Sequence, residues 1–152
     1  MASELVRDLR WLALAQHISS WSKDQSTQVG CVVVGSANQV LSLGYNGFPR
    51  GVNDTLDDRH ERPLKYKWTE HAERNAVYNA ARTGTSLNGS TLYVPFFPCA
   101  DCARAIIQSG IKQVVSPLPS SYSEEFTKRW SADFKISHEM FAEALVTVRY
   151  VN

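Results

Sequence analysis

The sequence predicts an α/β protein in which helices cover both faces of a mixed five-stranded sheet, giving a three-layer α/β/α sandwich. The first observation behind this prediction is that segments with the apolar pattern of strands alternate along the chain with segments that have a helical period. The second is that a chain of 152 residues, 43% hydrophobic and 20% charged, has the size and composition of one globular domain. We therefore treat residues 1–152 as a single domain.

The first half of the chain predicts one helix, two strands and a long loop. Residues 4–19 have the apolar period of a helix. Its predicted apolar face consists of Leu5, Leu9, Leu12, Ala15 and Ile18. Residues 29–35 (VGCVVVG) and 39–46 (QVLSLGYN) have the composition of two strands joined by a short turn. Residues 47–68 carry glycine, proline and charge without periodicity, which predicts a long loop of functional or mobile character.

The second half predicts helices and strands in alternation. A helix over about 70–82 is followed by Gly84, a helix stop signal. Its apolar side consists of Ala72, Ala76, Val77 and Ala80. A strand, a helix ended by Gly110 and a second strand follow, at residues 90–97, 99–110 and 112–117. Two shorter helices and a closing strand complete the prediction, at residues 123–131, 138–144 and 145–151.

The net charge favours a protein that binds small ligands, and the cysteine count favours free thiols. A net charge of +1 and a pI near 7.7 give no electrostatic reason to expect a nucleic-acid or membrane partner. Arg7, Asp8 and Arg10 interrupt the apolar pattern at the N-terminus, so this segment predicts neither a signal peptide nor a membrane span. We expect a cytoplasmic protein, in the host cytoplasm if the source is a virus. Three cysteines, an odd number, argue for reduced thiols.

Two short motifs carry the candidate chemistry. The first contains His71 and Glu73, and the second, PCADC, contains Cys99 and Cys102. The cysteine pair alone, between a strand and a helix, also suits a thioredoxin-like redox site. Both motifs lie at predicted helix starts, where two helix N-termini can face the same point. Helix N-termini carry partial positive charge, which favours the thiolates that a metal requires.

These residues suit a catalytic zinc ion. Two cysteines and one histidine supply three ligands and leave a fourth position open, whereas a structural zinc site takes a fourth protein ligand. A zinc-bound water has its pKa lowered to about 7, and a nearby carboxylate such as Glu73 can then carry protons. Cys31 is predicted to be a buried core thiol. None of the remaining candidates for a fourth ligand has ligand-like spacing: Cys31, His17, His60 and His138.

The two motifs together form the H-x-E and P-C-x-x-C signature of zinc-dependent nucleobase deaminases. With SKDQSTQVG (22–30), GYNGFPRG (44–51) and SGIKQVV (109–115), the chain resembles the deoxycytidylate (dCMP) deaminase branch of the cytidine/deoxycytidylate deaminase superfamily, over about residues 10–122. The resemblance implies a cytidine-deaminase-like fold and hydrolysis of dCMP to dUMP and ammonia, which supplies deoxyuridine nucleotide for thymidylate synthesis. Some members also accept dCTP as a substrate.

The resemblance also implies roles for individual residues. Glu73 matches the catalytic proton shuttle, Asn46 a contact to the sugar hydroxyl, and Lys23 a contact to the phosphate. The zinc ligands match His71, Cys99 and Cys102. We expect one Zn²⁺ per chain, because the loop that supplies a second zinc in some relatives has only His60 here. The substrate-binding set implied is Lys23, Gln28, Asn46, Ala72 and Tyr122.

The long loop carries a basic and aromatic cluster that, from the residues alone, suits a nucleic-acid patch, a phosphate site or a solvated loop. The cluster consists of Arg59, His60, Arg62, Lys65, Tyr66, Lys67 and Trp68. The resemblance implies an allosteric site for dCTP as activator and dTTP as inhibitor, with Mg²⁺ accompanying a triphosphate. The effector residues implied are Tyr45, Gly47 and Pro49.

Other readings stay open at the level of sequence. The resemblance implies a homo-oligomer, with a hexamer expected. A nucleic-acid deaminase acting on tRNA or single-stranded DNA would share the catalytic motifs but would be expected to carry a more basic surface. A thiol oxidoreductase would use Cys99 and Cys102 without metal and would leave His71 and Glu73 without a role.

Overall fold

The computed structural model describes residues 2–152 and contains one five-stranded sheet in the order β2-β1-β3-β4-β5. β1 pairs antiparallel with β2 and β3, while β3–β4 and β4–β5 are parallel pairs. The sheet is therefore mixed, and the predicted α/β/α fold class is confirmed. The strands are β1 (Gly30–Val34), β2 (Val40–Tyr45), β3 (Thr91–Tyr93), β4 (Gln113–Pro117) and β5 (Thr147–Val151).

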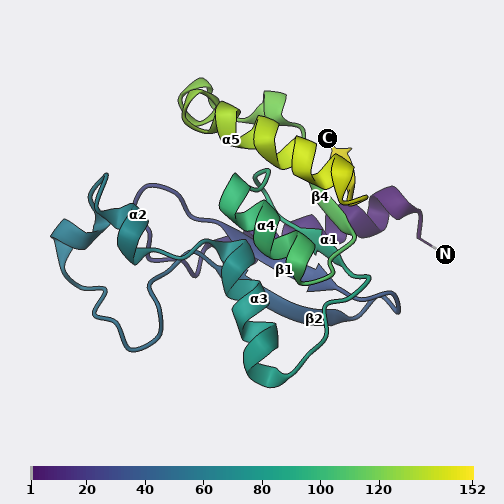
Figure 1. Ribbon diagram of the computed structural model, residues 1–152, viewed down its shortest axis with the longest axis horizontal. Coiled ribbons are helices and arrows are strands. Elements are labelled where there is room, and N and C mark those ends of the chain that lie inside the picture. The colour runs from purple at the N-terminus through teal and green to yellow at the C-terminus, as the bar shows by residue number, and fades with distance from the viewer. Residues whose placement is uncertain (1) are drawn as a thin grey trace.

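The helices form the two outer layers. Figure 1 shows α3 and α4 in front of the sheet, α1 behind it, and α5 packed beside α4. Two short 3-10 helices, Asp57–His60 and Pro119–Ser121, lie in connecting segments. The α-helices are α1 (Glu4–Ser19), α2 (Lys65–Trp68), α3 (Ala72–Thr83), α4 (Ala100–Gln108) and α5 (Glu124–Glu143). Among residues 2–152, none of these helices combines the length and the apolar character that crossing a bilayer requires.

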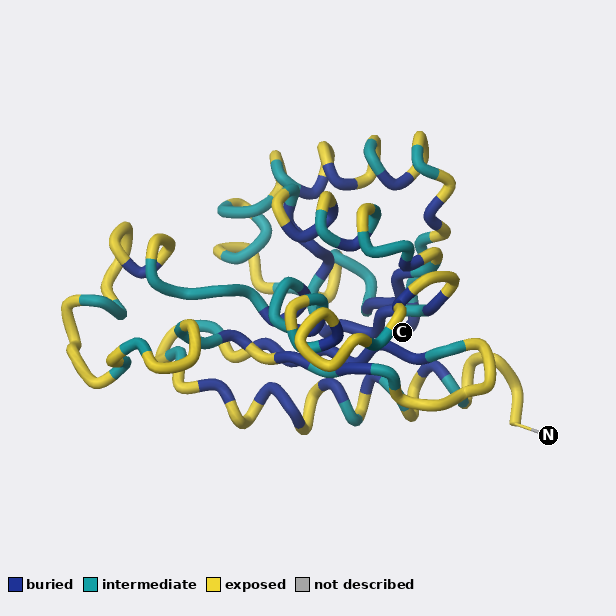
Figure 2. The backbone as a smooth tube through the Cα atoms, turned by 60° about the horizontal axis from the view of Figure 1, so that its bottom comes forward, coloured by how far each residue is buried: buried dark blue, intermediate teal, exposed yellow. Residues whose placement is uncertain are grey.

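Strand β1 divides the core into two layers. Its side chains alternate, so that Cys31 and Val33 pack in the cluster formed with α3, α4 and α5, while Val32 and Val34 pack in the cluster formed with α1. All five residues of β1 are buried, which explains the continuous apolar run in the sequence. In Figure 2 the dark blue, buried stretches of the tube accordingly lie in the middle of the molecule, with exposed yellow turns on its outside.

Helix α1 has the predicted limits, but its predicted apolar face was wrong at two positions. Leu5 and Leu9 are 55% and 44% exposed, whereas Asp8 is buried. The Asp8 carboxylate accepts hydrogen bonds from the Tyr93 hydroxyl at 3.0 Å and from Arg149 Nη2 at 2.8 Å. These bonds compensate for burial of the charge, so the helix can turn a polar residue toward the sheet.

Two shorter helices predicted at 123–131 and 138–144 are a single helix, α5. The segment between them contains neither glycine nor proline, so nothing in the backbone ends the helix there. Burial of Phe134, Ser137 and Phe141 continues the inner face without interruption. The long loop predicted at 47–68 contains two short helical segments that the prediction did not include, the 3-10 helix and α2. Figure 2 shows it extending away from the sheet and largely exposed.

Close contact between β2 and α3 places the residues that begin α3. A Cβ atom on Gly44 would lie 2.3 Å from the Ala72 carbonyl oxygen and 2.5 Å from the Ala76 nitrogen, both in the α3 backbone. The small side chains of Ala72 and Ala76 are fully buried at this contact. The backbones therefore meet without a side chain between them.

Substitution Gly44→Ala should lower the free energy of unfolding by about 1–3 kcal/mol, because the added methyl group forces α3 away from the sheet. Denaturant unfolding measures this change. Gly47→Ala is the matched control, since the nearest atom to a Cβ there is 4.0 Å away. An unchanged unfolding midpoint for Gly44→Ala would contradict the close approach.

Candidate active site

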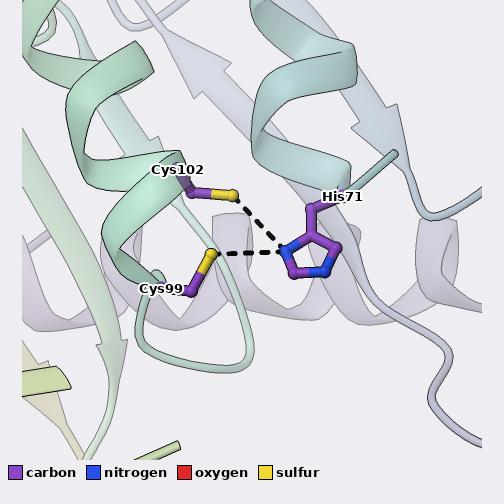
Figure 3. A group of neighbouring side chains, drawn as sticks. All are labelled: His71, Cys99 and Cys102. Carbon is purple, nitrogen blue, oxygen red and sulfur yellow. Dashed lines mark hydrogen bonds between the residues drawn. The ribbon is translucent and has the colours of Figure 1, made fainter. Parts of the chain in front are cut away.

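Three potential metal ligands meet where helices α3 and α4 begin. His71 occupies the N-cap position of α3, Cys99 occupies the N-cap position of α4, and Cys102 lies in the first turn of α4. Figure 3 shows the three side chains pointing toward one another. His71 Nδ1 lies 3.5 Å from Cys99 Sγ and 3.5 Å from Cys102 Sγ. The predicted convergence of the two motifs is therefore present in the structure.

The donor geometry fits a tetrahedral zinc ion. Zn–S bonds of about 2.3 Å and Zn–N bonds of about 2.1 Å at a tetrahedral angle place sulfur and nitrogen about 3.6 Å apart. The sulfur–nitrogen distances of 3.5 Å match this value. Within residues 2–152, no other His, Cys, Asp or Glu side chain joins the group of three. Three protein ligands with an open fourth position are typical of catalytic zinc sites.

A cationic side chain, Arg74, lies beside the two thiols. Arg74 Nη1 lies 3.3 Å from Cys102 Sγ, and the same guanidinium is held by the carboxylate of Glu70. A hydrogen bond from the Cys102 thiol, together with His71, lowers the pKa of Cys99 to about 4, although burial opposes this shift. The thiolate form, which binds metal, is therefore favoured at Cys99.

Glu73 lies beside the three ligands but is not one of them. It occupies the first turn of α3, is buried, and has its Oε2 atom 3.5 Å from Cys102 Sγ. Burial raises the pKa of the Glu73 carboxyl, while the nearby His71 opposes that increase. Because His71 precedes the first helical residue, the spacing of two residues does not send the side chains to opposite sides of a helix. A carboxyl with a raised pKa can exchange a proton near neutral pH.

His71, Glu73 and Cys99 line one cavity, here called the site cavity. Asn46, which follows β2, also lines this cavity, and so do several side chains of α5. The Trp130 ring of α5 meets the His71 ring edge to face, with centroids 5.8 Å apart. Apolar and aromatic walls around a few convergent polar groups are typical of small-molecule sites.

Comparison with known proteins identifies the family. The family model described as "Cytidine and deoxycytidylate deaminase zinc-binding region" matches residues 6–117. The chain belongs to this deaminase family. The match includes both motifs that contain the three ligands, HAE and PCADC. It also includes strands β1 to β4 of the sheet.

The relatives of the deaminase are similar over most of its length. An Aliivibrio fischeri protein named "Uncharacterized deaminase in luxG 3'region" is 42% identical over 142 residues, which cover 93% of this chain and 91% of the relative. Mouse deoxycytidylate deaminase is 35% identical over 136 residues, covering 86% and 75%. The crystal structure of a dCMP deaminase from cyanophage S-TIM5, in complex with dCMP and dUMP, superposes with a TM-score of 0.75 at 25% identity, covering 99% and 100%. The chain is thus a deaminase enzyme.

Of the predicted substrate residues, Asn46 lines the site cavity of the deaminase, and Ala72 is hydrogen-bonded to it. The Asn46 side-chain oxygen accepts a hydrogen bond from the Ala72 N–H at 2.8 Å, and its amide nitrogen donates to the Thr27 carbonyl at 3.2 Å. These two bonds fix the orientation of the amide. Ala72 is fully buried, and its carbonyl accepts a hydrogen bond from the Cys31 thiol at 3.2 Å.

Three other predicted substrate residues do not line the site cavity. Lys23 Nζ pairs with Asp54 at 2.9 Å, and its side chain is 72% exposed. The Gln28 side-chain amide donates to a backbone carbonyl of the same loop. The Tyr122 hydroxyl accepts from the Phe97 N–H at 2.9 Å and donates to a backbone carbonyl at 3.0 Å. Their contacts to substrate stay predictions.

The predicted effector residues surround a different surface pocket. Tyr45, Gly47 and Pro49 line it together with two cationic side chains, Arg50 and Arg82. The pocket lies along the outer side of α3 and does not include His71 or Glu73. An effector role for these residues stays a prediction.

Sequence reasoning missed the contribution of α5 to the site. Asp133 Oδ1 accepts a hydrogen bond from the Ala100 N–H at 3.1 Å and so fixes the start of α4, next to Cys99. Arg129 and Trp130 line the site cavity from the same helix. The signal in the sequence was the helical spacing of three aromatic residues in a segment that we treated as two helices: Phe126, Trp130 and Phe134.

A buried ion pair joins the α1–β1 loop to helix α2 beside the site cavity. Lys65 Nζ lies 3.0 Å from Asp24 Oδ2, and the two side chains are only 7% and 8% exposed. Lys65 also donates to the Ser26 hydroxyl at 2.6 Å. Burial alone would raise the pKa of Asp24, but the N–H groups of Ser26 and Thr27 and the Lys65 ammonium outweigh it, so the pKa is lowered.

Asp24→Asn should lower the free energy of unfolding at pH 7 by about 3–5 kcal/mol, because it leaves the buried Lys65 charge without a counter-ion. The folded-state pKa of Asp24 is below its ordinary value of 3.8, so its stabilising effect is present above about pH 4 and is lost as the pH falls through the folded-state pKa. Urea unfolding at pH 7 and pH 3 should therefore show the difference from wild type shrinking in acid.

The control for this experiment is Asp58→Asn, at an exposed carboxylate outside every ion pair of residues 2–152. It should change the free energy of unfolding by no more than about 0.5 kcal/mol. Equal stability of Asp24→Asn and wild type at pH 7 would mean that the ion pair does not hold the loop.

Proposed function

We propose that this deaminase hydrolyses dCMP to dUMP and ammonia. The observation that carries the proposal is a buried carboxyl, Glu73, next to three convergent ligands in a cavity lined by aromatic and cationic side chains. Further support comes from relatives named deoxycytidylate deaminase and from the similar phage enzyme, whose structure contains dCMP and dUMP.

His71, Cys99 and Cys102 would hold one zinc ion. A zinc ion bound there supplies Lewis acidity and lowers the pKa of a bound water to about 7. Glu73 would move the protons. Its carboxylate takes one from the attacking water and delivers it to ring N3; it then takes the proton of the hydroxyl formed at C4 and passes it to the amino group, which departs as ammonia. The raised pKa of the Glu73 carboxyl suits this exchange, because the group must both accept and release a proton near neutral pH.

Asn46 would bind the sugar of the nucleotide. A side-chain amide has two N–H donors and two acceptor lone pairs. One donor is occupied by Thr27 and one lone pair by the Ala72 N–H, so one of each remains for a ligand hydroxyl. Because both protein bonds fix the amide plane, its free donor and acceptor have defined directions.

Regulation and assembly are parts of the same proposal. We expect dCTP to activate and dTTP to inhibit through the pocket beside Tyr45, Gly47 and Pro49, with Mg²⁺ accompanying the triphosphate. The arginines of that pocket, Arg50 and Arg82, support an anionic ligand.

A homo-oligomer, expected as a hexamer, is supported by the exposed apolar side of α1, which consists of Leu5, Val6 and Leu9.

Glu73→Gln should lower kcat for dCMP by about 10²- to 10⁴-fold, because the amide cannot carry a proton, while zinc stays at one ion per chain.

Cys99→Ala should lose zinc, since it removes one of three ligands. Ammonia release and elemental analysis of the purified variants measure these outcomes. Substantial turnover by Glu73→Gln, or wild-type zinc content in Cys99→Ala, would contradict the assigned roles.

A substrate panel tests the proposed function. Ammonia release should be fastest with dCMP among dCMP, dCTP, cytidine and a cytosine-containing single-stranded oligonucleotide. Preference for the oligonucleotide would indicate a nucleic-acid deaminase, and disulfide exchange without ammonia release would indicate a thiol oxidoreductase. Repeating the dCMP assay with added dCTP and dTTP tests the effectors, and an equal rate in all three assays would refute regulation.

A further inference from the structure

Three cationic side chains of α2, α5 and the segment before α2 line the site cavity. Arg62 precedes α2, Lys65 is the first residue of α2, and Arg129 lies in α5. Lys65 is neutralised by the buried carboxylate of Asp24. The charges of the two arginines are therefore the ones available to a ligand.

Arg62 has no anionic partner among residues 2–152, where every ion pair within 4.0 Å involves other side chains. Its guanidinium donates only to neutral oxygens, the Tyr66 hydroxyl at 2.9 Å and the Ser26 hydroxyl at 3.2 Å. These two bonds, together with the nearby Lys65–Asp24 pair, hold the guanidinium in the lining of the site cavity.

Arg129 has only a weak competitor for its charge. Its Nη2 atom lies 3.2 Å from Glu125, whose side chain is 86% exposed, while the Arg129 side chain is 27% exposed. Ion pairs with such an exposed partner contribute little, because water competes for both charges. A ligand anion inside the cavity can therefore replace Glu125 at small cost.

Each of the two arginines adjoins one ring of an aromatic bridge. Tyr66 of α2 and Trp130 of α5 meet edge to face, with ring centroids 6.4 Å apart. Arg62 donates to the Tyr66 hydroxyl, and Arg129 precedes Trp130 on its helix. The Trp130 ring also contacts the His71 ring, so the bridge connects the arginines to the catalytic end of the cavity.

We propose that Arg62 and Arg129 bind the 5′-phosphate of the substrate and select a nucleotide over a nucleoside. This assignment rests on the proposed function, since it places the base at His71 and Glu73. Guanidinium groups match phosphate oxygens through paired N–H donors, which gives direction as well as charge. Lys23, the phosphate residue implied by family resemblance, instead faces Asp54 outside the site cavity.

The first test compares dCMP with deoxycytidine, which lacks the phosphate. Arg129→Gln and Arg62→Gln should each lower kcat/KM for dCMP about 10- to 100-fold more than kcat/KM for deoxycytidine, mainly through KM. The matched control is Arg104→Gln, an exposed arginine of α4 paired with Asp101 and outside the site cavity. It should leave the ratio of the two kcat/KM values within about twofold of wild type.

The second test measures binding without turnover, by calorimetry with dUMP and deoxyuridine. The dUMP affinity should fall about 10- to 100-fold in Arg129→Gln and in Arg62→Gln, with a much smaller change for deoxyuridine. If wild type binds dUMP in this arginine-dependent way but does not deaminate dCMP, the proposed function fails and the phosphate assignment stands.

Four results would overturn the assignment. The first is a dCMP-to-deoxycytidine ratio that matches wild type in both arginine variants and in the double variant. The second is equal loss of dUMP and deoxyuridine affinity, which would mean that the arginines support the fold or the base site. The third is failure of wild type to bind dUMP. The fourth is loss of phosphate selectivity in Lys23→Gln while the arginine variants keep it.

Discussion

The attachment of the first residue of α3 to two strands is the constraint on which the site depends. The Ala72 N–H is held by the Asn46 side chain, and the Ala72 carbonyl accepts from the Cys31 thiol. Gly44 lets the helix backbone come this close to β2. Since Ala72 lies between His71 and Glu73 in the chain, fixing its peptide groups fixes the origin of both functional side chains. Both side chains therefore extend from backbone that is already held in place.

The same attachment explains why the two side chains differ in environment. His71 precedes the helix and projects past its end to the two cysteines, whereas Glu73 is inside the first turn and is covered by the core. The result is a ligand in contact with thiols and a carboxyl whose pKa is raised by burial. Two neighbouring residues on one short segment thereby acquire distinct chemistry without a specialised loop.

The fold and the ligand set could be predicted because they depend on local information. Strand and helix periods gave the five strands, and the residue types His, Cys and Glu indicated zinc chemistry from their spacing. The burial of Asp8 could not be predicted in this way, because its partner Arg149 is 141 residues distant in the chain. The orientation of Lys23 is similar: it depends on Asp54, a loop residue whose position no periodicity indicates. Long-range charge pairing therefore limits what can be predicted from local pattern.

Helix α5 contributes both to the metal ligands and to the charge of the site cavity. Asp133 fixes the start of α4 beside Cys99, while Arg129, one turn earlier, lines the cavity. A terminal phosphate carries a charge of about −1.5 to −2 at pH 7, whereas the phosphodiester of a polynucleotide carries a single charge. The two guanidinium groups in the cavity lining match the charge of the terminal phosphate better. The net charge of +1 leaves little further attraction for a polymer. The charge of these two arginines thus favours a free mononucleotide over a nucleic-acid strand. The zinc ligands play no part in this preference.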